Sequence, residues 1–421
     1  MATGRAVLLI ALLSCASALV VGLVSRAPAE VRAADPGRAA TDPGLGSQFT
    51  DEQVARHGIY RRAGYLGFAL AFILEIALLI VLARGPLGRL VSSVESWRGG
   101  LVVHAAVVGI AVAAIGVAAS LPLSFVRGFM INRAWGLSTQ NAAGWAIDVA
   151  KGAGVGAVFA AGATIAFFAV VRWQPRTWWV WGWAAFTALS ALLVWLYPIA
   201  IAPLFNNFTP LRDVELTEQV KGLAQEAGVN VDEVLVADAS RRTTSENAYV
   251  AGLGSTKQVV VYDTLLRSGE TDETLFVVAH ELGHERENHV VKNLLLTSVG
   301  LLIGFGLLQP LSRRTGVWAW AGASGIADLR AIPVLLLFSS VVGFLTLPIQ
   351  NTVSRNFETR ADEIAIELTH DSAVAVRSFR RLAFANLADL RPPRAAVFWL
   401  FSHPPLADRI ESALAADAPG P

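Results

Sequence analysis

Seven long apolar stretches constrain this chain more than any other feature of its sequence. They lie at about Leu8–Val24, Gly64–Leu82, Leu101–Leu121, Val149–Val171, Trp178–Ala202, Leu294–Leu311 and Ile332–Ile349. Each has about the twenty apolar residues that a helix needs to cross the hydrocarbon core of a bilayer. With 54% hydrophobic residues and a mean hydropathy of +0.51, the chain is too apolar for an ordinary soluble protein. We therefore predict a polytopic α-helical membrane protein with about seven transmembrane helices.

The first stretch allows two interpretations. Leu8–Val24 is long enough to remain as a span, and we favour this interpretation. It also resembles a secretory signal peptide, because it follows Arg5 and precedes a small-x-small site at Val31-Arg32-Ala33. Cleavage there would change only the mature N-terminus.

Two counts exclude whole classes of function. The net charge of +1 argues against a polyanionic partner, so we expect no nucleic acid. The single cysteine, Cys15, excludes a disulfide framework within the chain and a zinc site built from thiolates.

Between the fifth and sixth stretches the composition changes to that of a soluble α+β domain. Helical periodicity, strand-forming residues and turn residues occur there in an order typical of such a domain. They predict a helix at Asp213–Ala227 closed by Gly228, a strand at Glu233–Ala237, and a hairpin of Ala248–Ala251 and Gln258–Tyr262 around Gly252–Ser255.

A zinc-protease motif, His280-Glu281-Leu282-Gly283-His284, lies in the predicted helix Leu275–Val291. Positions four apart share one helix face, so His280 and His284 can both bind one metal ion. Zinc suits two imidazoles and a carboxylate, with a fourth position left open for water. Glu281 then lies beside that position and can take a proton from the water. We therefore predict one Zn²⁺ per chain, with Glu281 as the general base.

The third zinc ligand is allowed to lie beyond two further spans, because two spans return the chain to the same side of the membrane. Our candidate is Glu358, 74 residues past His284. Asp362, four residues later on a predicted helix, can accept the outer N–H of a ligating histidine and so fix its orientation. A solvated charged helix face is the alternative for this acidic run, and it also accounts for Glu363 and Glu367.

Several other polar residues near these segments are weaker candidates. His289 lies five residues past His284, on a different helix face, and Glu287 is too close in sequence to reach the metal from the same helix. His403 could donate to the oxyanion that forms during hydrolysis. Arg409 could bind a carboxylate of the substrate or of the site. A helix start at His403 with Arg409 on the surface explains that segment equally well.

Further sequence blocks accompany the zinc motif. They are Pro203–Leu211, Ser240-Arg241-Arg242 with Ser245–Tyr249, Val261–Leu266, Ser354-Arg355 with Glu358 and Asp362, and His403-Pro404-Pro405-Leu406 with Arg409. In kind and order these blocks resemble the type I CAAX prenyl protease family of integral-membrane zinc metallopeptidases, with its gluzincin-type site. The resemblance covers the chain roughly from Leu121 to the C-terminus, and the five spans before the catalytic segment agree with it.

The resemblance implies a role for each residue that matches the family's motifs. It implies that His280, His284 and Glu358 are zinc ligands and that Glu281 is the general base. It also implies substrate and transition-state contacts at Asn247 and His403. Arg409 is expected in the active site. Zincin sites place an edge strand beside the histidine helix, to which an extended substrate can add. Ala248 and Tyr249 therefore join Asn247 as expected substrate contacts.

The resemblance also implies an overall architecture. The family's seven helices enclose a water-filled chamber, which an inserted α+β zincin-like peptidase domain closes. Glu75 and His104 lie inside predicted spans, so they either line such a chamber or make hydrogen bonds between helices. Before the catalytic part we expect a first span or signal at 1–25, an extramembrane loop at 26–62 and four helices at 63–202. The zinc domain with its histidine helix follows at 203–292. Two helices at 293–350 separate it from the rest of the peptidase domain at 351–421.

Three functions are compatible with these patterns. The first is a CAAX prenyl protease-like zinc metalloendopeptidase, since the family acts on the C-terminal tripeptide of isoprenylated proteins. The second is a quality-control protease for membrane proteins with no prenyl requirement, whose relatives have fewer spans before the zinc domain. The third is a non-catalytic scaffold or transporter, but a structural zinc site normally has four protein ligands and only three are found.

We expect a multi-pass protein of the plasma membrane that contacts lipid and acts on a peptide or protein substrate, lipidated or membrane-embedded substrates included. Lysine and arginine are about equally frequent in the short loops on the two sides, so they do not determine orientation. The arginine-rich C-terminal segment favours a zinc domain that faces the cytoplasm.

Overall fold

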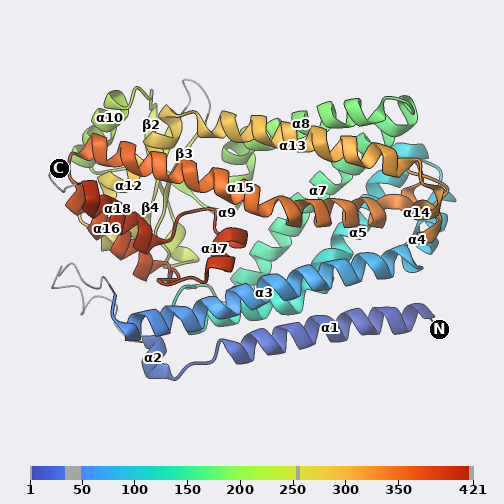
Figure 1. Ribbon diagram of the computed structural model, residues 1–421, viewed down its shortest axis with the longest axis horizontal. Coiled ribbons are helices and arrows are strands. Elements are labelled where there is room, and N and C mark those ends of the chain that lie inside the picture. Colours follow the sequence, from blue (N-terminus) through green and yellow to red (C-terminus); the bar gives the residue numbers. More distant parts are fainter. Residues whose placement is uncertain (1, 34–48, 253–256, 417–421) are drawn as a thin grey trace.

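The computed structural model describes residues 2–33, 49–252 and 257–416. It shows a bundle of long helices with a small α+β domain at one end (Figure 1). In the described ranges, 7 helices are long and apolar enough to cross a membrane, which confirms the predicted spans. They are α1 (Ala2–Val24), α3 (Asp51–Ala83), α5 (Gly100–Ser124), α7 (Ala142–Trp173), α8 (Trp178–Leu196), α13 (His289–Ser312) and α15 (Ile332–Thr369).

Shorter helices connect these spans or belong to the α+β domain. They are α2 (Ala29–Ala33), α4 (Pro86–Glu95), α6 (Asn132–Ala134), α9 (Ala202–Phe205), α10 (Val214–Glu226), α11 (Asp263–Ser268), α12 (Thr271–Arg286), α14 (Thr315–Trp320), α16 (Ser372–Ala385), α17 (Arg394–Leu400) and α18 (Leu406–Ala416). Two π-helical turns, Phe125–Ile131 and Tyr197–Ile201, continue α5 and α8.

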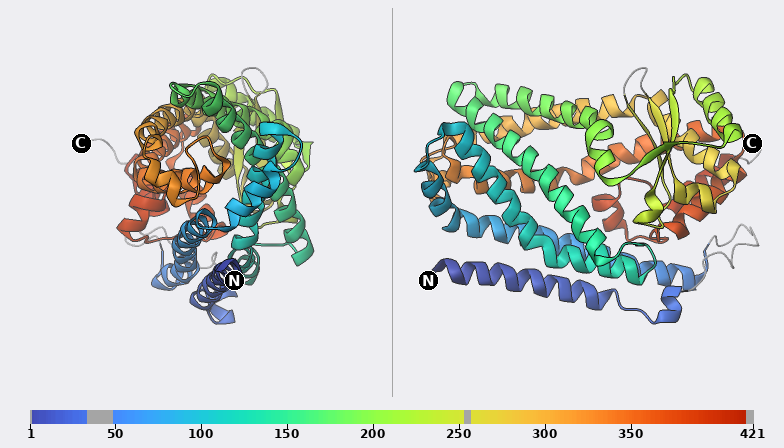
Figure 2. Two further views of the ribbon diagram at one scale, coloured as in Figure 1. Left: turned by 90° about the vertical axis from the view of Figure 1, so that its right-hand side faces the viewer. Right: turned by 180° about the vertical axis from the view of Figure 1, so that it is seen from behind.

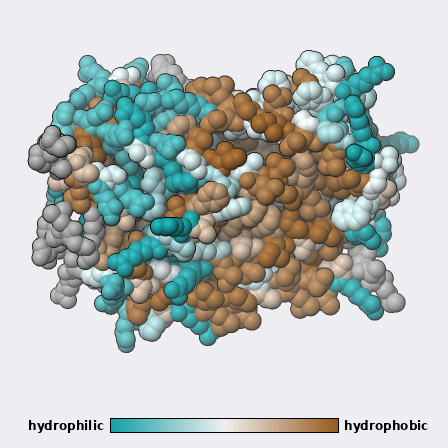
Figure 3. All heavy atoms as spheres, viewed as in Figure 1, coloured by the Kyte–Doolittle hydropathy of each residue, from teal (hydrophilic) through white to brown (hydrophobic). Residues whose placement is uncertain are grey.

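The outer surface of the bundle is hydrophobic. Figure 3 shows a hydrophobic band across the long helices, with hydrophilic surface over the α+β domain and at the opposite end. Large apolar side chains of the long helices are exposed, among them Ile110, Val158, Leu295 and Ile349. Exposed apolar surface of this extent marks contact with a membrane, and helices satisfy the hydrogen bonds of their own backbone in lipid. The chain is a multi-span membrane protein, with the N-terminus of α1 at the end away from the α+β domain (Figure 2).

The α+β domain contains a 4-stranded sheet with the order β1-β2-β4-β3. The strands are β1 (Phe208–Pro210), β2 (Glu233–Ala237), β3 (Ala248–Ala251) and β4 (Gln258–Tyr262). Strands β2 and β4 are parallel, whereas β1 and β3 pair antiparallel with their neighbours. The predicted strands and the pairing of the predicted hairpin are confirmed, although residues 253–256 of its loop lie outside the described ranges. β3 is an edge strand of this sheet.

Helix α12 belongs to the hydrophobic core of the α+β domain. Its Phe276, Val278 and Leu282 are buried in one cluster with Val220 of α10 and Phe379 of α16. The rings of Phe276 and Phe379 meet edge to face at 5.3 Å. Burying side chains of this size provides most of the driving force for folding. The domain is therefore built from two chain segments, one on each side of α13 and α15.

Three helix boundaries differ from the predicted ones. The predicted helix Leu275–Val291 ends at Arg286, because Asn288 adopts a left-handed backbone with φ 54° and α13 begins at the next residue. Asparagine is among the few residues that tolerate this conformation. The boundary drawn between 350 and 351 falls inside α15, which continues unbroken to Thr369. Helix α3 begins at Asp51, inside the segment expected as a loop, where Thr50 caps it.

Candidate metal centre and active site

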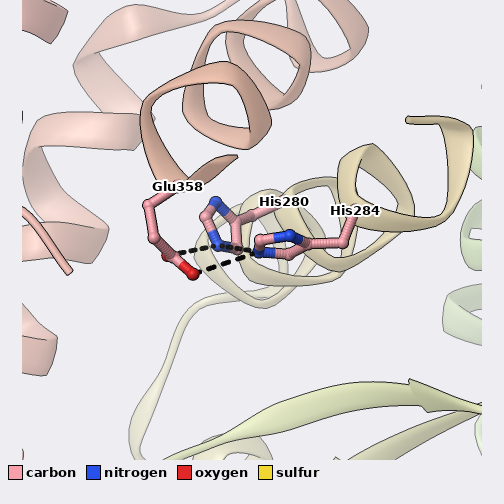
Figure 4. A group of neighbouring side chains, drawn as sticks. All are labelled: His280, His284 and Glu358. Carbon is pink, nitrogen blue, oxygen red and sulfur yellow. Dashed lines mark hydrogen bonds and ion pairs between the residues drawn. The ribbon is translucent and has the colours of Figure 1, made fainter. Parts of the chain in front are cut away.

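His280 and His284 lie one turn apart on α12, and Glu358 reaches them from α15 (Figure 4). His280 Nε2 lies 3.3 Å from Glu358 Oε2, and His284 Nε2 lies 3.4 Å from Glu358 Oε1. The two Nε2 atoms are 3.1 Å apart. One donor atom from each residue can be chosen so that all lie within 4.8 Å of one another. The fold thus brings the predicted trio together across two membrane helices.

A close helix crossing makes this arrangement possible. Gly283 lies against α15 so closely that a Cβ at this position would be 3.1 Å from the carbonyl oxygen of Ala361. Ala361 is itself small and fully buried. Because both residues are small, α12 and α15 can approach, and Glu358, about one turn before Ala361, faces the histidines. The glycine inside the motif therefore allows a close approach of the two helices that a larger residue would widen.

The donor set fits a divalent metal ion. Glu358 Oε2 is buried and has no hydrogen-bond partner. Two imidazole nitrogens face each other beside it, and their lone pairs repel unless a proton or a cation lies between them. Two imidazoles with one carboxylate form the donor set of catalytic zinc sites, which keep a further position open.

His280 is held from behind by Asp362, as the spacing predicted. Its Nδ1 lies 2.8 Å from Asp362 Oδ1. Burial alone lowers the pKa of His280, but the carboxylates of Asp362 and Glu358 outweigh it and raise that pKa to about 9. If Nε2 held a metal ion, the proton of neutral His280 would lie on Nδ1, and its hydrogen bond to Asp362 would fix the tautomer and the ring orientation.

Arg409 binds a carboxylate of the site, one of the two alternatives that the sequence left open. Its guanidinium donates to both oxygens of Asp362, and its side chain is 9% exposed. The same guanidinium lies over the ring of Phe379, 4.3 Å from the centroid. Arg409 therefore contacts Asp362, and Asp362 in turn contacts His280.

A cavity of about 330 Å³ opens beside His280. Glu281 lines it together with Asn247, His403 and the apolar side chains of Phe276 and Leu406. Burial raises the pKa of the Glu281 carboxyl, while the nearby histidines lower it by a smaller amount, so the pKa lies above its ordinary value. A carboxylate in this position suits a base that must take a proton near neutral pH.

Asn247 precedes the candidate metal ligands in the sequence and His403 follows them, but both line this cavity. His403 Nε2 is 3.3 Å from Glu358 Oε1. The hydroxyl of Ser402 lies 2.9 Å from His403 Nδ1, and a hydrogen bond donated by Ser402 leaves the His403 proton on Nε2, which faces the ligands. Ser402 was not predicted, because a single serine before a histidine carries no signal in the sequence.

The expected substrate contacts lie at the start of the edge strand β3. The carbonyl oxygen of Asn247 accepts a hydrogen bond from the backbone N–H of Tyr262 at 3.0 Å. Ala248 is buried and pairs with Val261. Tyr249 packs edge to face on Tyr262. In the described ranges, β3 pairs with β4 on one side and with no strand on the other, and it contacts α12.

The structure also places the weaker candidates. Glu287 forms ion pairs with Lys292 and Arg360 and does not join the metal-binding group. Glu75 accepts a hydrogen bond from Ser340 of α15, so it links two membrane helices. His104 lies near the start of α5 with its Nε2 3.2 Å from the carbonyl oxygen of Trp97, which places it at the end of the span.

Comparisons with known proteins identify the family of this chain. Residues 40–207 match the family described as CAAX prenyl protease N-terminal, five membrane helices, and residues 210–417 match peptidase family M48. A Bacillus subtilis relative named uncharacterized metalloprotease YhfN is 33% identical over 70% of this chain and 69% of its own length. CAAX prenyl protease 1 of Saccharomyces cerevisiae is 29% identical over 69% of this chain and 67% of the relative.

A solved structure shows the same fold over nearly the whole chain. The crystal structure of S. mikatae Ste24p superimposes with a TM-score of 0.76, covering 97% of this chain and 98% of the other, at 22% sequence identity. The family matches, the bacterial relative and the shared fold lead to one assignment. The chain belongs to peptidase family M48 and is a multi-span membrane metalloprotease of the CAAX prenyl protease type.

Proposed function

We propose that this metalloprotease is a zinc-dependent endopeptidase that removes C-terminal residues from prenylated proteins. The observation that carries the proposal is the placement of His280, His284 and Glu358 around one point, with Glu281 in the adjoining cavity. A carboxylate beside two imidazole ligands can serve as the base of a metallopeptidase. The family matches support peptide-bond hydrolysis as the reaction.

In the proposed mechanism, His280, His284 and Glu358 hold one zinc ion. When bound, zinc acts as a Lewis acid that polarises the scissile carbonyl and makes a water molecule more acidic. Glu281 takes a proton from the attacking water and later delivers it to the leaving amine. His403, protonated on Nε2, donates a hydrogen bond to the oxyanion of the tetrahedral intermediate.

We propose that the substrate binds as an added strand on β3. Its main chain pairs with the free edge between Asn247 and Tyr249, and the side chain of Asn247 contacts the peptide in the cavity. The added strand holds the scissile bond beside Glu281, because β3 lies next to α12. Main-chain pairing gives affinity with little dependence on sequence, so the lipid is the source of specificity.

We also propose the plasma membrane as the location, with the zinc domain facing the cytoplasm. The arginine-rich segment on α15 and α16 (Arg355, Arg360, Arg377, Arg380 and Arg381) supports this orientation, since positively charged segments favour the cytoplasmic side. A prenylated substrate is consistent with this location, because its lipid lies in the membrane beside the long helices.

A cleavage assay on the detergent-purified, zinc-loaded protein tests the proposal. One peptide that ends in a CAAX sequence is compared with and without a farnesyl group on its cysteine, with Glu281→Gln as the blank, and products are identified by mass spectrometry. We expect cleavage after the cysteine in the farnesylated peptide only. Equal cleavage of both peptides at scattered sites would contradict the prenyl requirement and support a quality-control protease.

A further inference from the structure

A third histidine lies beside the candidate metal centre and contacts His284, whereas Asp362 contacts His280. His289 Nδ1 is 2.8 Å from His284 Nδ1, and the two rings meet at 67° with their centroids 5.0 Å apart. His289 is 3% exposed although it begins a membrane helix. It makes its contact with the nitrogen of His284 that faces away from Glu358 and His280.

We propose that His289 is a positioning residue that fixes the zinc ligand His284 by accepting a hydrogen bond from its Nδ1. His284 faces the other ligands through Nε2, so a metal there requires the lone pair of that nitrogen. The proton of neutral His284 then lies on Nδ1, and only an acceptor can face it. His289 must therefore present an unprotonated Nδ1 and carry its own proton on Nε2.

His289 is rigid enough for this role. Its ring stacks on Phe357 of α15 with the centroids 4.2 Å apart and the planes at 14°. Phe357 directly precedes the third ligand, Glu358, so one imidazole contacts both helices that supply the metal ligands. The backbone of His289 is held as well. The residue before it, Asn288, has a left-handed conformation and lies between the end of α12 and the start of α13.

The two histidine ligands are thus held by acceptors of different charge. His280 Nδ1 contacts the carboxylate of Asp362, whereas His284 Nδ1 contacts the neutral imidazole of His289. A carboxylate acceptor makes its histidine a stronger electron donor, and a neutral acceptor fixes the tautomer without adding charge. With one carboxylate acceptor and one neutral acceptor, less negative charge surrounds the ligands than with two carboxylates. A metal ion held there would therefore be a stronger electrophile.

Two substitutions separate the hydrogen bond from packing. His289→Asn keeps an acceptor, since its Oδ1 occupies about the position of the histidine Nδ1, but it loses the ring that stacks on Phe357. His289→Phe keeps a ring for stacking and has no acceptor. Val290→Ala, an exposed position in the same turn, is the matched control.

The experiment measures zinc affinity of the full-length, detergent-purified variants by competition with a chelator of known affinity. The absorption bands of the Co²⁺-loaded proteins and the thermal unfolding of the metal-free proteins are measured in parallel. We expect His289→Phe to bind zinc about 10–100-fold more weakly and to shift the Co²⁺ bands. His289→Asn and Val290→Ala should bind zinc with nearly the wild-type affinity.

The inference rests on the proposed zinc site, and the outcomes distinguish the two. Wild-type affinity and unchanged Co²⁺ bands in His289→Phe would contradict the role of His289 and leave the zinc site intact. A loss of zinc affinity in His289→Asn as large as or larger than the loss in His289→Phe, together with a less stable metal-free His289→Asn protein, would show that the ring packs and that its acceptor nitrogen has no role. A wild-type protein that binds no zinc would contradict the proposed site itself.

Discussion

Arg409 donates to both carboxylate oxygens of Asp362, from Nε at 2.7 Å and from Nη2 at 2.5 Å. Asp362 in turn lies 2.8 Å from Nδ1 of His280. A helix near the C-terminus thereby sets the orientation of a residue in the zinc motif, more than one hundred positions earlier. A carboxylate with both oxygens bound cannot rotate freely, so the direction of His280 is determined by Arg409 as well as by Asp362.

We expect Arg409→Lys to weaken zinc binding about tenfold while leaving the charge unchanged, because an ammonium group cannot make the two parallel hydrogen bonds of a guanidinium. Chelator competition on the purified variant measures this effect. Arg394→Lys, at an exposed arginine of α17, is the control and should bind zinc as the wild type does. Wild-type affinity in Arg409→Lys would show that Asp362 is oriented without the guanidinium.

A second buried arginine stabilises the α+β domain. Arg381 donates to Glu246, just before β3, and to Glu273 in the first turn of α12, at 2.7 and 2.5 Å. All three side chains are largely buried. Gly269 lies directly beneath this guanidinium, and a Cβ at that position would overlap it.

We expect Gly269→Ala to displace Arg381 from the two carboxylates and to destabilise the protein by about 3 kcal/mol, as breaking a buried ion pair does. Gly222→Ala, in α10 with open space around the new methyl group, is the control and should stabilise the protein by up to about 1 kcal/mol. Thermal unfolding in detergent measures both changes. Equal melting temperatures for the two variants would contradict the account of Arg381.

Zinc affinity should depend on pH through His280. Burial opposes its protonation, but Asp362 and Glu358 raise its pKa from 6.5 to about 9. Because the pKa is raised in the folded state, the proton stabilises the metal-free fold below pH 6.5, and this contribution is lost as pH rises through about 9.

Zinc must displace that proton, so we expect zinc affinity to increase by up to about tenfold per pH unit between pH 6.5 and about 9. The metal-free protein should become less stable over the same range. Chelator competition and thermal unfolding at several pH values measure the two trends. A zinc affinity that does not change with pH would contradict the raised pKa of His280.

The membrane spans could be predicted because hydrocarbon imposes a minimum length of apolar sequence. The same rule does not detect the parts of a helix that extend into water. Helix α15 continues from Ile349 through the polar run around Arg355 to Thr369, and α3 begins thirteen residues before its apolar part at Gly64. Polar residues on a helix outside the membrane resemble those of a loop, so both ends were placed too close to the apolar stretch.

The members of the candidate site were predictable as residue types, and their contacts were not. Motif spacing and the parity of the spans indicated His280, His284 and Glu358. The role of Arg409 remained open because its partner, Asp362, lies on α15, and their contact depends on how α18 packs against α15 and α16. His289 was considered a weak ligand from its helical position, but the left-handed Asn288 breaks the helix and turns the His289 ring toward His284.

The measurement that tests the central claim most directly is metal content and peptide cleavage on the same preparations of wild type, Glu281→Gln and Glu358→Ala. We expect one zinc ion and cleavage for the wild type, one zinc ion and no cleavage for Glu281→Gln, and loss of both for Glu358→Ala. Cleavage by Glu281→Gln would remove the proposed base. A zinc content in Glu358→Ala equal to that of the wild type would contradict the proposed third ligand.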